Sequence, residues 1–185
     1  MIVLKTPEEL QLMHQANALV HETLRLVAEA ARPGVSTAEL DALAEGHIRA
    51  HGALPAFKGY RGYPATLCTS VNDVIVHGIP ARDCRLREGD VLSVDCGVLW
   101  SGFYGDAAVT VPVGAVSDEA AGLLRVTREC LDAAVAVVQP GRRLTDLGDV
   151  IQRHAEAAGY SVVREFVGHG VGRALHEEPQ VYNFG

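Results

Sequence analysis

The feature that most constrains the fold is an internal repeat. Residues 32–36 (Arg-Pro-Gly-Val-Ser) align without gaps to residues 139–143, and in the same frame Leu40, His47 and Gly52 meet Leu147, His154 and Gly159. Helix-stopping Pro-Gly pairs occur in any helical protein. An ungapped frame, however, favours a duplicated α+β half. No linker separates the halves, so we expect one domain over residues 1–185.

Capping signals predict where the helices begin. Thr6 with Glu9, and Ser36 with Glu39, have the spacing of capping boxes, and Pro7 suits the first helical position. Pro-Gly pairs and Gly52 mark helix ends. The expected helices run from 7 to the stop at 32–34, from 37 to near 52, from 117 to about 138, and from 145 to 158.

Strands are expected in the middle of the chain. Residues 66–76 read as strand, turn and strand, with Asn72-Asp73 as the turn. Residues 91–99 and 103–113 are rich in β-formers and flank Trp100-Ser101-Gly102, which predicts a hairpin. A further strand is expected over residues 161–167.

The hairpin carries two carboxylates. If Trp100 and Ser101 form its loop, Asp95 lies directly opposite Asp106, with their Cβ atoms ~4.5–5.5 Å apart. Burying such a pair is costly unless a shared proton or a bridging cation neutralises it. A longer loop would change this register. Alternatively, one Asp could cap a turn while the other pairs with an Arg.

Three histidines suit a metal or catalytic site. His77, His169 and His176 each lie in a segment flanked by glycine or proline, and Gly-His-Gly at 168–170 permits close backbone approach. Imidazole with carboxylate suits Mn, Fe, Co or Zn, whereas the glycine run lacks the spacing of a phosphate loop. The other histidines fall on expected helices or their ends, at surface or core-edge positions: His14, His21, His47, His51 and His154.

Composition narrows the function further. The net charge of −7 argues against a general nucleic-acid surface, and no segment resembles a signal peptide or a membrane span. The four cysteines form no CxxC pair, which favours reduced thiols in the cytoplasm.

Several motifs together resemble those of type I methionine aminopeptidases, in the pita-bread metallopeptidase superfamily. The resemblance spans essentially the whole chain, in order. The matching segments are Gly-Tyr-Arg-Gly-Tyr-Pro at 59–64, Ser-Val-Asn-Asp at 70–73, His-Gly-Ile-Pro at 77–80, Val94-Asp95 with Gly105-Asp106, Gly-His-Gly-Val-Gly at 168–172, and His-Glu-Glu-Pro-Gln-Val at 176–181.

This resemblance implies an α+β pita-bread fold with a pseudo-twofold repeat, which agrees with the internal repeat in the sequence. It implies Asp95, Asp106 and His169 as metal ligands, with His77 and His176 contacting the substrate. The implied methionine pocket comprises Tyr60, Tyr63, Cys68 and Leu175, the last where relatives commonly have Phe. Asn72 and Val74 match a loop that binds a monovalent cation in some members.

The implied reaction removes the initiator methionine when the next residue is small. It would use divalent ions, two in the complete enzyme, drawn from Co, Mn, Fe or Zn. Implied partners are N-termini of nascent chains and, as a further candidate, the ribosome; no membrane and no specific nucleic acid is expected. Two alternatives stay open: a related Xaa-Pro-type peptidase, and a catalytically impaired module that binds peptides or nucleic acid.

One part of the family pattern finds no match. The family carries two further glutamate ligands and last strands for which no counterpart precedes Gly185, and Glu165, Glu177 and Glu178 do not replace them. We therefore expect a form lacking the C-terminal quarter of the domain, with weak metal binding and poor turnover.

Overall fold

The computed structural model describes residues 1–185, which form two compact units. The larger unit comprises residues 3–117 and 171–175. The smaller unit comprises residues 1–2, 118–170 and 176–185. Each unit is described by itself. None of the helices is both long and apolar enough to cross a bilayer.

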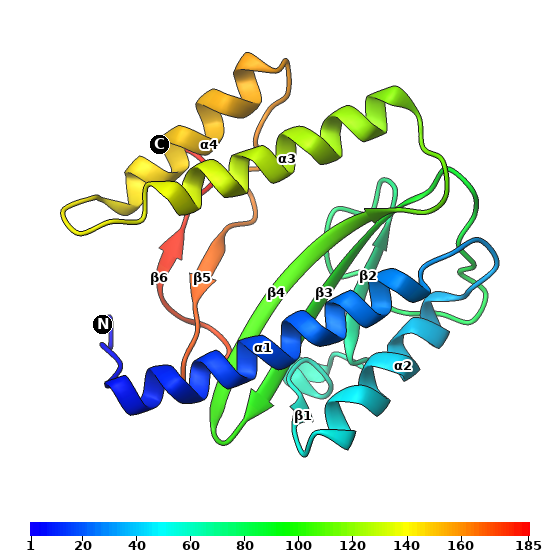
Figure 1. The fold of residues 1–185 in the computed structure, drawn as a ribbon, viewed down its shortest axis with the longest axis horizontal. Helices are drawn as coiled ribbons and strands as arrows, with labels where there is room; N and C mark the ends of the chain where they lie inside the picture. The colour runs from blue at the N-terminus through cyan, green and yellow to red at the C-terminus, as the bar shows by residue number, and fades with distance from the viewer. The chain divides into compact units, whose positions relative to one another are not determined.

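The larger unit is an antiparallel sheet covered by two helices. Its strands are β1 (Leu54–Pro55), β2 (Leu67–Val71), β3 (Val91–Trp100) and β4 (Phe103–Pro112). β3 pairs with β4 on one side and with β1 and β2 on the other. Helix α1 (Pro7–Ala30) lies along β4 and β3, with α2 (Thr37–Ala50) beside it (Figure 1). A short 3-10 turn, η1 (Tyr60–Gly62), precedes β2.

The core lies between these helices and one face of the sheet. Val94, Cys96 and Val98 alternate along β3 and are fully buried in one apolar cluster with Val20 and Leu40 of the helices. The period of two along β3 leaves Asp95 and Gly97 on the opposite face. Packing of the helices therefore determines which face carries the carboxylates.

Both predicted capping boxes are confirmed. The Glu9 amide donates to the Thr6 hydroxyl at 3.2 Å, and the Thr6 amide donates to the Glu9 carboxylate at 2.9 Å. Ser36 and Glu39 repeat the arrangement at the start of α2. Reciprocal capping satisfies amides that the first helical turn would otherwise leave unpaired.

The smaller unit consists of two helices and a short strand pair. Helices α3 (Asp118–Ala136) and α4 (Leu144–Ala157) pack through Val126, Cys130 and Ala155. β5 (Gly168–Gly170) pairs antiparallel with β6 (Glu177–Val181), with a bulge between His169 and Gly170. The predicted strand at 161–167 is wrong, because no strand pairs with this segment and Val162 packs against the helix pair instead.

The repeat seen in the sequence is present in the helix boundaries. A shift of 107 residues carries α2 onto α4 at both ends. The same shift carries Gly34 (φ 91°) onto Gly141 (φ 89°), and Gly52 (φ 74°) onto Gly159 (φ 85°). Glycine suits these positions because it adopts positive φ without steric cost. Each unit thus contains one copy of the same helix–stop–helix motif.

The second half of the predicted strand pair at 66–76 is also wrong. Residues 74–76 form no strand, and the Val74 and Ile75 side chains are exposed. The free edge of β2 is paired elsewhere, because the Thr69 amide donates to the Gly78 carbonyl at 2.8 Å. Residues 74–76 consequently form an exposed loop between β2 and Gly78.

Close approach of α1 to the sheet yields a stability prediction. A Cβ at Gly105 would lie 2.7 Å from the Ala16 carbonyl carbon, whereas a Cβ at Gly46, inside α2, would meet nothing within 4 Å. We expect Gly105→Ala to lower the free energy of unfolding by about 1–3 kcal/mol through overpacking. We expect the matched control Gly46→Ala to raise it by about 0.5–1 kcal/mol through helix propensity. Urea unfolding measures both, and equal effects would contradict this packing.

Candidate metal centre and substrate pocket

Asp95 and Asp106 lie on the same face of the β3–β4 hairpin, but not directly opposite each other. Asp95 pairs with Ala108, and Asp106 pairs with Gly97. The predicted register was therefore wrong, because the two-residue loop lies one position further along the chain than predicted. The turn is Ser101-Gly102, whose φ values of 48° and 82° match the two-residue turn that fits the twist of a hairpin. The carboxylates are diagonal neighbours, which long or polar side chains still span.

The two carboxyl groups interact strongly in this position. Burial, followed by the negative charge of Asp95 and a hydrogen bond between the two carboxyl groups, raises the pKa of Asp106 to about 8. Such a shift means that the site favours neutralisation of one carboxylate. A proton achieves this in the metal-free protein, and a divalent cation with oxygen ligands would achieve it as well. The donor set of the larger unit therefore fits a metal ion.

Helix α1 fixes the backbone at Asp106. The Asp106 amide donates to Asn17 Oδ1 at 3.3 Å, and Asn17 Nδ2 donates to the Met13 carbonyl at 2.9 Å. Gly105 permits this approach, because any side chain there would collide with the α1 backbone. The sequence interpretation missed Asn17, since its contact with β4 spans 89 positions along the chain and has no local signal.

Another residue missed from the sequence is Asp41 of α2. Its Oδ1 accepts hydrogen bonds from the Thr66 and Leu67 amides at 2.9 and 2.8 Å, at the entry to β2. Burial raises the pKa of Asp41, although these two backbone hydrogen bonds oppose the rise. Asp41 thereby anchors the strand that places Cys68 opposite Asp95.

His77 is held at the edge of β2 by its neighbour Gly78. His77 is exposed and has φ 59°, while a Cβ at Gly78 would collide with the Thr69 carbonyl. The Gly78 amide donates to Ser70 Oγ at 3.1 Å, and the Tyr63 hydroxyl lies 3.0 Å from the Gly78 carbonyl oxygen. These contacts explain why a glycine follows this histidine, and they make its backbone position well defined.

The predicted pocket residues of the larger unit do come together. Phe57, Cys68 and Leu175 form a buried apolar cluster, against which four partly buried side chains pack: Ala56, Tyr60, Tyr63 and Tyr104. Gly97 leaves room for Phe57, because a Cβ there would lie 2.5 Å from the ring. Since Cys68 pairs with Asp95 across β2 and β3, the apolar cluster adjoins the carboxylates. Burial raises the pKa of the Cys68 thiol to about 11.

Leu175 reaches this cluster through the short segment 171–175. The Tyr104 amide donates to the Gly172 carbonyl at 2.8 Å. Arg173 pairs with Glu9 at 3.0 Å and lies 4.4 Å from the Phe103 ring centroid. These contacts secure the segment to α1 and β4, and Leu175 remains only 3% exposed.

His169 and His176 come together within the smaller unit. Their rings stack with centroids 4.1 Å apart and planes 28° apart. His169 Nδ1 lies 3.0 Å from the Gly170 carbonyl oxygen, so the tautomer protonated there leaves Nε2 with its lone pair. A Cβ at Gly170 would meet the Glu178 carbonyl at 2.7 Å, which explains the glycine after His169.

Asn72 has a clear role within the larger unit. It adopts φ 54°, donates to Asp90 at 2.9 Å and accepts from the Val91 amide at 2.9 Å. The side chain of Asn72 therefore joins the loop after β2 to the start of β3.

The profile of Metallopeptidase family M24 matches residues 11–185. The chain belongs to this family. It is 49% identical over 185 residues to methionine aminopeptidase of Clostridium acetobutylicum, covering all of this chain and 74% of that protein. It is 42% identical to methionine aminopeptidase of Escherichia coli, over 99% of this chain and 70% of that one. Membership of a metallopeptidase family implies a divalent metal.

Solved M24 structures confirm the α+β pita-bread fold. A methionine aminopeptidase from Thermotoga maritima superposes with a TM-score of 0.98 at 44% identity, over all of this chain and 74% of that one. A prolidase from Pyrococcus furiosus gives a TM-score of 0.86 at 23% identity, over 98% of this chain and 52% of that one. The second likeness concerns the fold alone.

The raised pKa of Asp106 predicts a pH-dependent stability for this M24 protein without metal. Between the unfolded-state pKa of ~3.9 and the folded value, the folded chain holds a proton that the unfolded chain has lost. Stability contributed by Asp106 is therefore present in acid and is lost as the pH rises through about 8. We expect Asp106→Asn to gain stability relative to wild type between pH 5 and pH 9.

Urea unfolding in EDTA measures this difference. Asp118→Asn, on the exposed first turn of α3, is the matched control and should show no such trend. An Asp106→Asn effect that is the same at both pH values would contradict the coupling of the two carboxylates.

Proposed function

We propose that this chain is a metal-dependent aminopeptidase that releases N-terminal methionine from proteins whose second residue is small. The observation that carries the proposal is the half-buried carboxylate pair beside an apolar cluster on one face of the β2–β3–β4 sheet. Named relatives at 42–49% identity over nearly the whole chain support the same activity. In this proposal residues 1–185 act as one catalytic domain.

Asp95, Asp106 and His169 are the proposed ligands of divalent ions, two in the complete family site. Co, Mn, Fe and Zn all suit a set of carboxylates and imidazole. When bound, the metal supplies Lewis acidity and lowers the pKa of a coordinated water. The carboxylates contribute negative charge, and the apolar side chains around Cys68 would lower the local polarity, which strengthens electrostatic interactions. Asn72 and Val74 are proposed to bind a monovalent cation through main-chain oxygens.

The two remaining histidines are proposed to act on the substrate. His176 would donate a hydrogen bond to the oxyanion that develops at the scissile carbonyl. His77 would contact the scissile amide nitrogen, which leaves as the amine of the shortened protein. The fixed backbone around Gly78 supports this role, because hydrogen bonds tie the segment to β2 and to Tyr63.

The proposed methionine pocket is formed by Tyr60, Tyr63, Cys68 and Leu175. Methionine is a flexible apolar side chain and would pack against these groups. Each methylene of a competing side chain is worth only about 1–3 kcal/mol, so rejection of larger side chains requires a closed pocket wall. Leu175, buried against Phe57 and Cys68, supplies part of that wall.

The proposed partners are the N-termini of newly made proteins, met in the cytoplasm, and the ribosome on which they appear. A net charge of −7 is compatible with attraction of a positively charged amino terminus. The charge also argues against general nucleic-acid binding.

Methionine release provides the direct test. With added Mn²⁺ or Co²⁺, the chain is expected to release Met from a Met-Ala-Ser peptide, and EDTA is expected to stop the reaction. Asp106→Asn is expected to lower kcat/KM by about 100-fold or more, since even outer-shell partners of metal ligands contribute 10–100-fold. Asp118→Asn should retain the wild-type rate.

Three outcomes would contradict the proposal. Cleavage confined to bonds before proline would identify an Xaa-Pro-type peptidase. Peptide binding that EDTA leaves unchanged, without turnover, would identify a binding module. Equal rates of methionine release by Asp106→Asn and wild type would show that the carboxylate pair takes no part in the reaction.

A further inference from the structure

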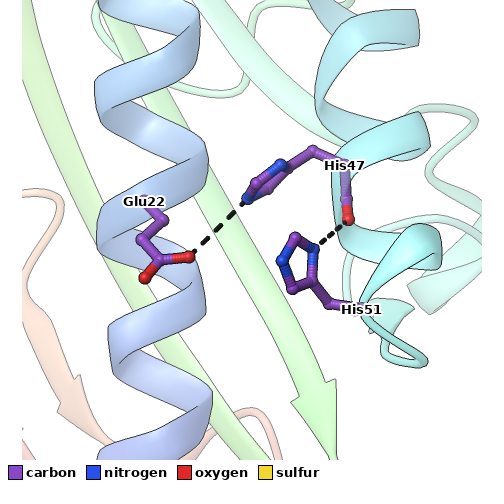
Figure 2. A group of neighbouring side chains, drawn as sticks. All are labelled: Glu22, His47 and His51. Atoms are coloured by element: carbon purple, nitrogen blue, oxygen red, sulfur yellow. Dashed lines mark hydrogen bonds and ion pairs between the residues drawn. The ribbon is translucent and has the colours of Figure 1, made fainter.

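A second group of potential metal ligands lies on the helices of the larger unit. Glu22 comes from α1, His47 from the last turn of α2, and His51 is the residue that caps α2. One ligand atom from each lies within 4.8 Å of the others. Figure 2 shows the Glu22 carboxylate and the two imidazole rings turned toward one another across the gap between the helices.

The spacing of the two histidines suits joint coordination. Residues four apart on a helix share one face, and paired histidines at this spacing are a recurrent zinc-binding arrangement. The rings of His47 and His51 have centroids 4.4 Å apart. Their planes are inclined by 51°, so they do not simply stack.

A hydrogen bond at Nδ1 of His51 leaves Nε2 available to bind a metal ion. His51 Nδ1 lies 2.8 Å from the His47 carbonyl oxygen, which can only accept a hydrogen bond. Nδ1 therefore carries the proton, and Nε2 of neutral His51 keeps its lone pair. A backbone carbonyl that fixes the tautomer in this way is the usual outer-shell partner of a metal-bound histidine.

His47 supplies the second, independent observation. Its Nε2 is buried and has no hydrogen-bond partner. The Glu22 Oε2 atom lies 4.0 Å from this nitrogen, beyond hydrogen-bond distance. Leaving a buried polar atom without a hydrogen-bond partner destabilises the folded state. An ion between Glu22 and the imidazoles would satisfy it.

The internal repeat offers a comparison within the same molecule. The shift of 107 residues carries Glu22 onto Glu129 and His47 onto His154, and these two form a close pair at 2.9 Å. Ala158 stands at the position equivalent to His51. In the second copy of the repeat, Glu129 and His154 thus form a direct ion pair. In the first copy, Glu22 and His47 are farther apart, and His51 adds a third potential ligand.

From this geometry we propose that Glu22, His47 and His51 form a Zn²⁺ site that links α1 to α2, separate from the carboxylate pair. Two imidazoles and one carboxylate match zinc, whereas Mg²⁺ and Ca²⁺ prefer oxygen ligands alone. Zinc ligands lie about 2.0–2.2 Å from the ion, so the Glu22 oxygen must move inward by roughly 1 Å. The Glu22 side chain is 56% exposed, which leaves it room to make this movement. Water would complete a tetrahedral shell.

Zinc counting by competition with a chromophoric chelator tests the proposal on the whole chain. Wild type is expected to bind one more Zn²⁺ than His51→Ala, and Glu22→Gln should weaken that ion at least tenfold. His154→Ala, in the equivalent pair without a third ligand, is the matched control and should bind as wild type. Asp106→Asn should keep the helix-bound ion, and in that background Zn²⁺ should raise Tm only while His51 is present.

Two results would overturn the proposal. Equal zinc stoichiometry and affinity in wild type and His51→Ala would show that the histidines do not bind the ion. Loss of all zinc in Asp106→Asn would assign every ion to the carboxylate site. Methionine release by His51→Ala is expected to match wild type, so failure of this site and failure of the aminopeptidase activity are separately visible.

Discussion

The partial burial of two carboxylates on one face of a hairpin is the constraint on which the other features of the larger unit depend. Apolar packing of α1 and α2 against the alternate residues of β3 leaves Asp95 and Asp106 on the other face. Burial, followed by the negative charge of Asp95, raises the pKa of Asp106 and makes neutralisation favourable. A site that favours neutralisation is ready to bind a cation, because binding relieves a cost already present in the folded chain. Gly97 lets the Phe57 ring approach on the face that carries the carboxylates, and Gly105 lets the α1 backbone approach on the opposite face.

Most of the secondary structure could be predicted because its signals are local. Capping boxes, Pro-Gly stops and alternating apolar residues each act within a few positions, and they placed all four long helices and the β3–β4 hairpin. The hairpin register was wrong because Trp100-Ser101 and Ser101-Gly102 both fit the loop. Gly102 should have decided between them, since both central residues of this turn need positive φ.

The remaining errors and omissions concern contacts between distant parts of the chain. Residues 74–76 and 161–167 have the composition of strands, yet a strand needs a neighbouring strand, and neither segment is paired in a sheet. Asn17 and Asp41 hold the strands that carry the site, but their partners lie 89 and 25–26 positions away. The motifs around His77 and the apolar cluster were recognised by family resemblance, and the structure supplies the physical reason for their glycines. The roles of the individual site residues remain proposals.

The central claim is that Asp95 and Asp106 bind a divalent metal on the face of the sheet that adjoins the apolar cluster. The most direct test is an anomalous difference map from crystals of the chain grown with Mn²⁺, collected at a wavelength where manganese scatters anomalously. The account predicts a peak within about 2.0–2.4 Å of a carboxylate oxygen of each residue, as expected for a divalent ion with oxygen ligands. A map from such crystals that shows no peak between these two carboxylates would contradict this claim.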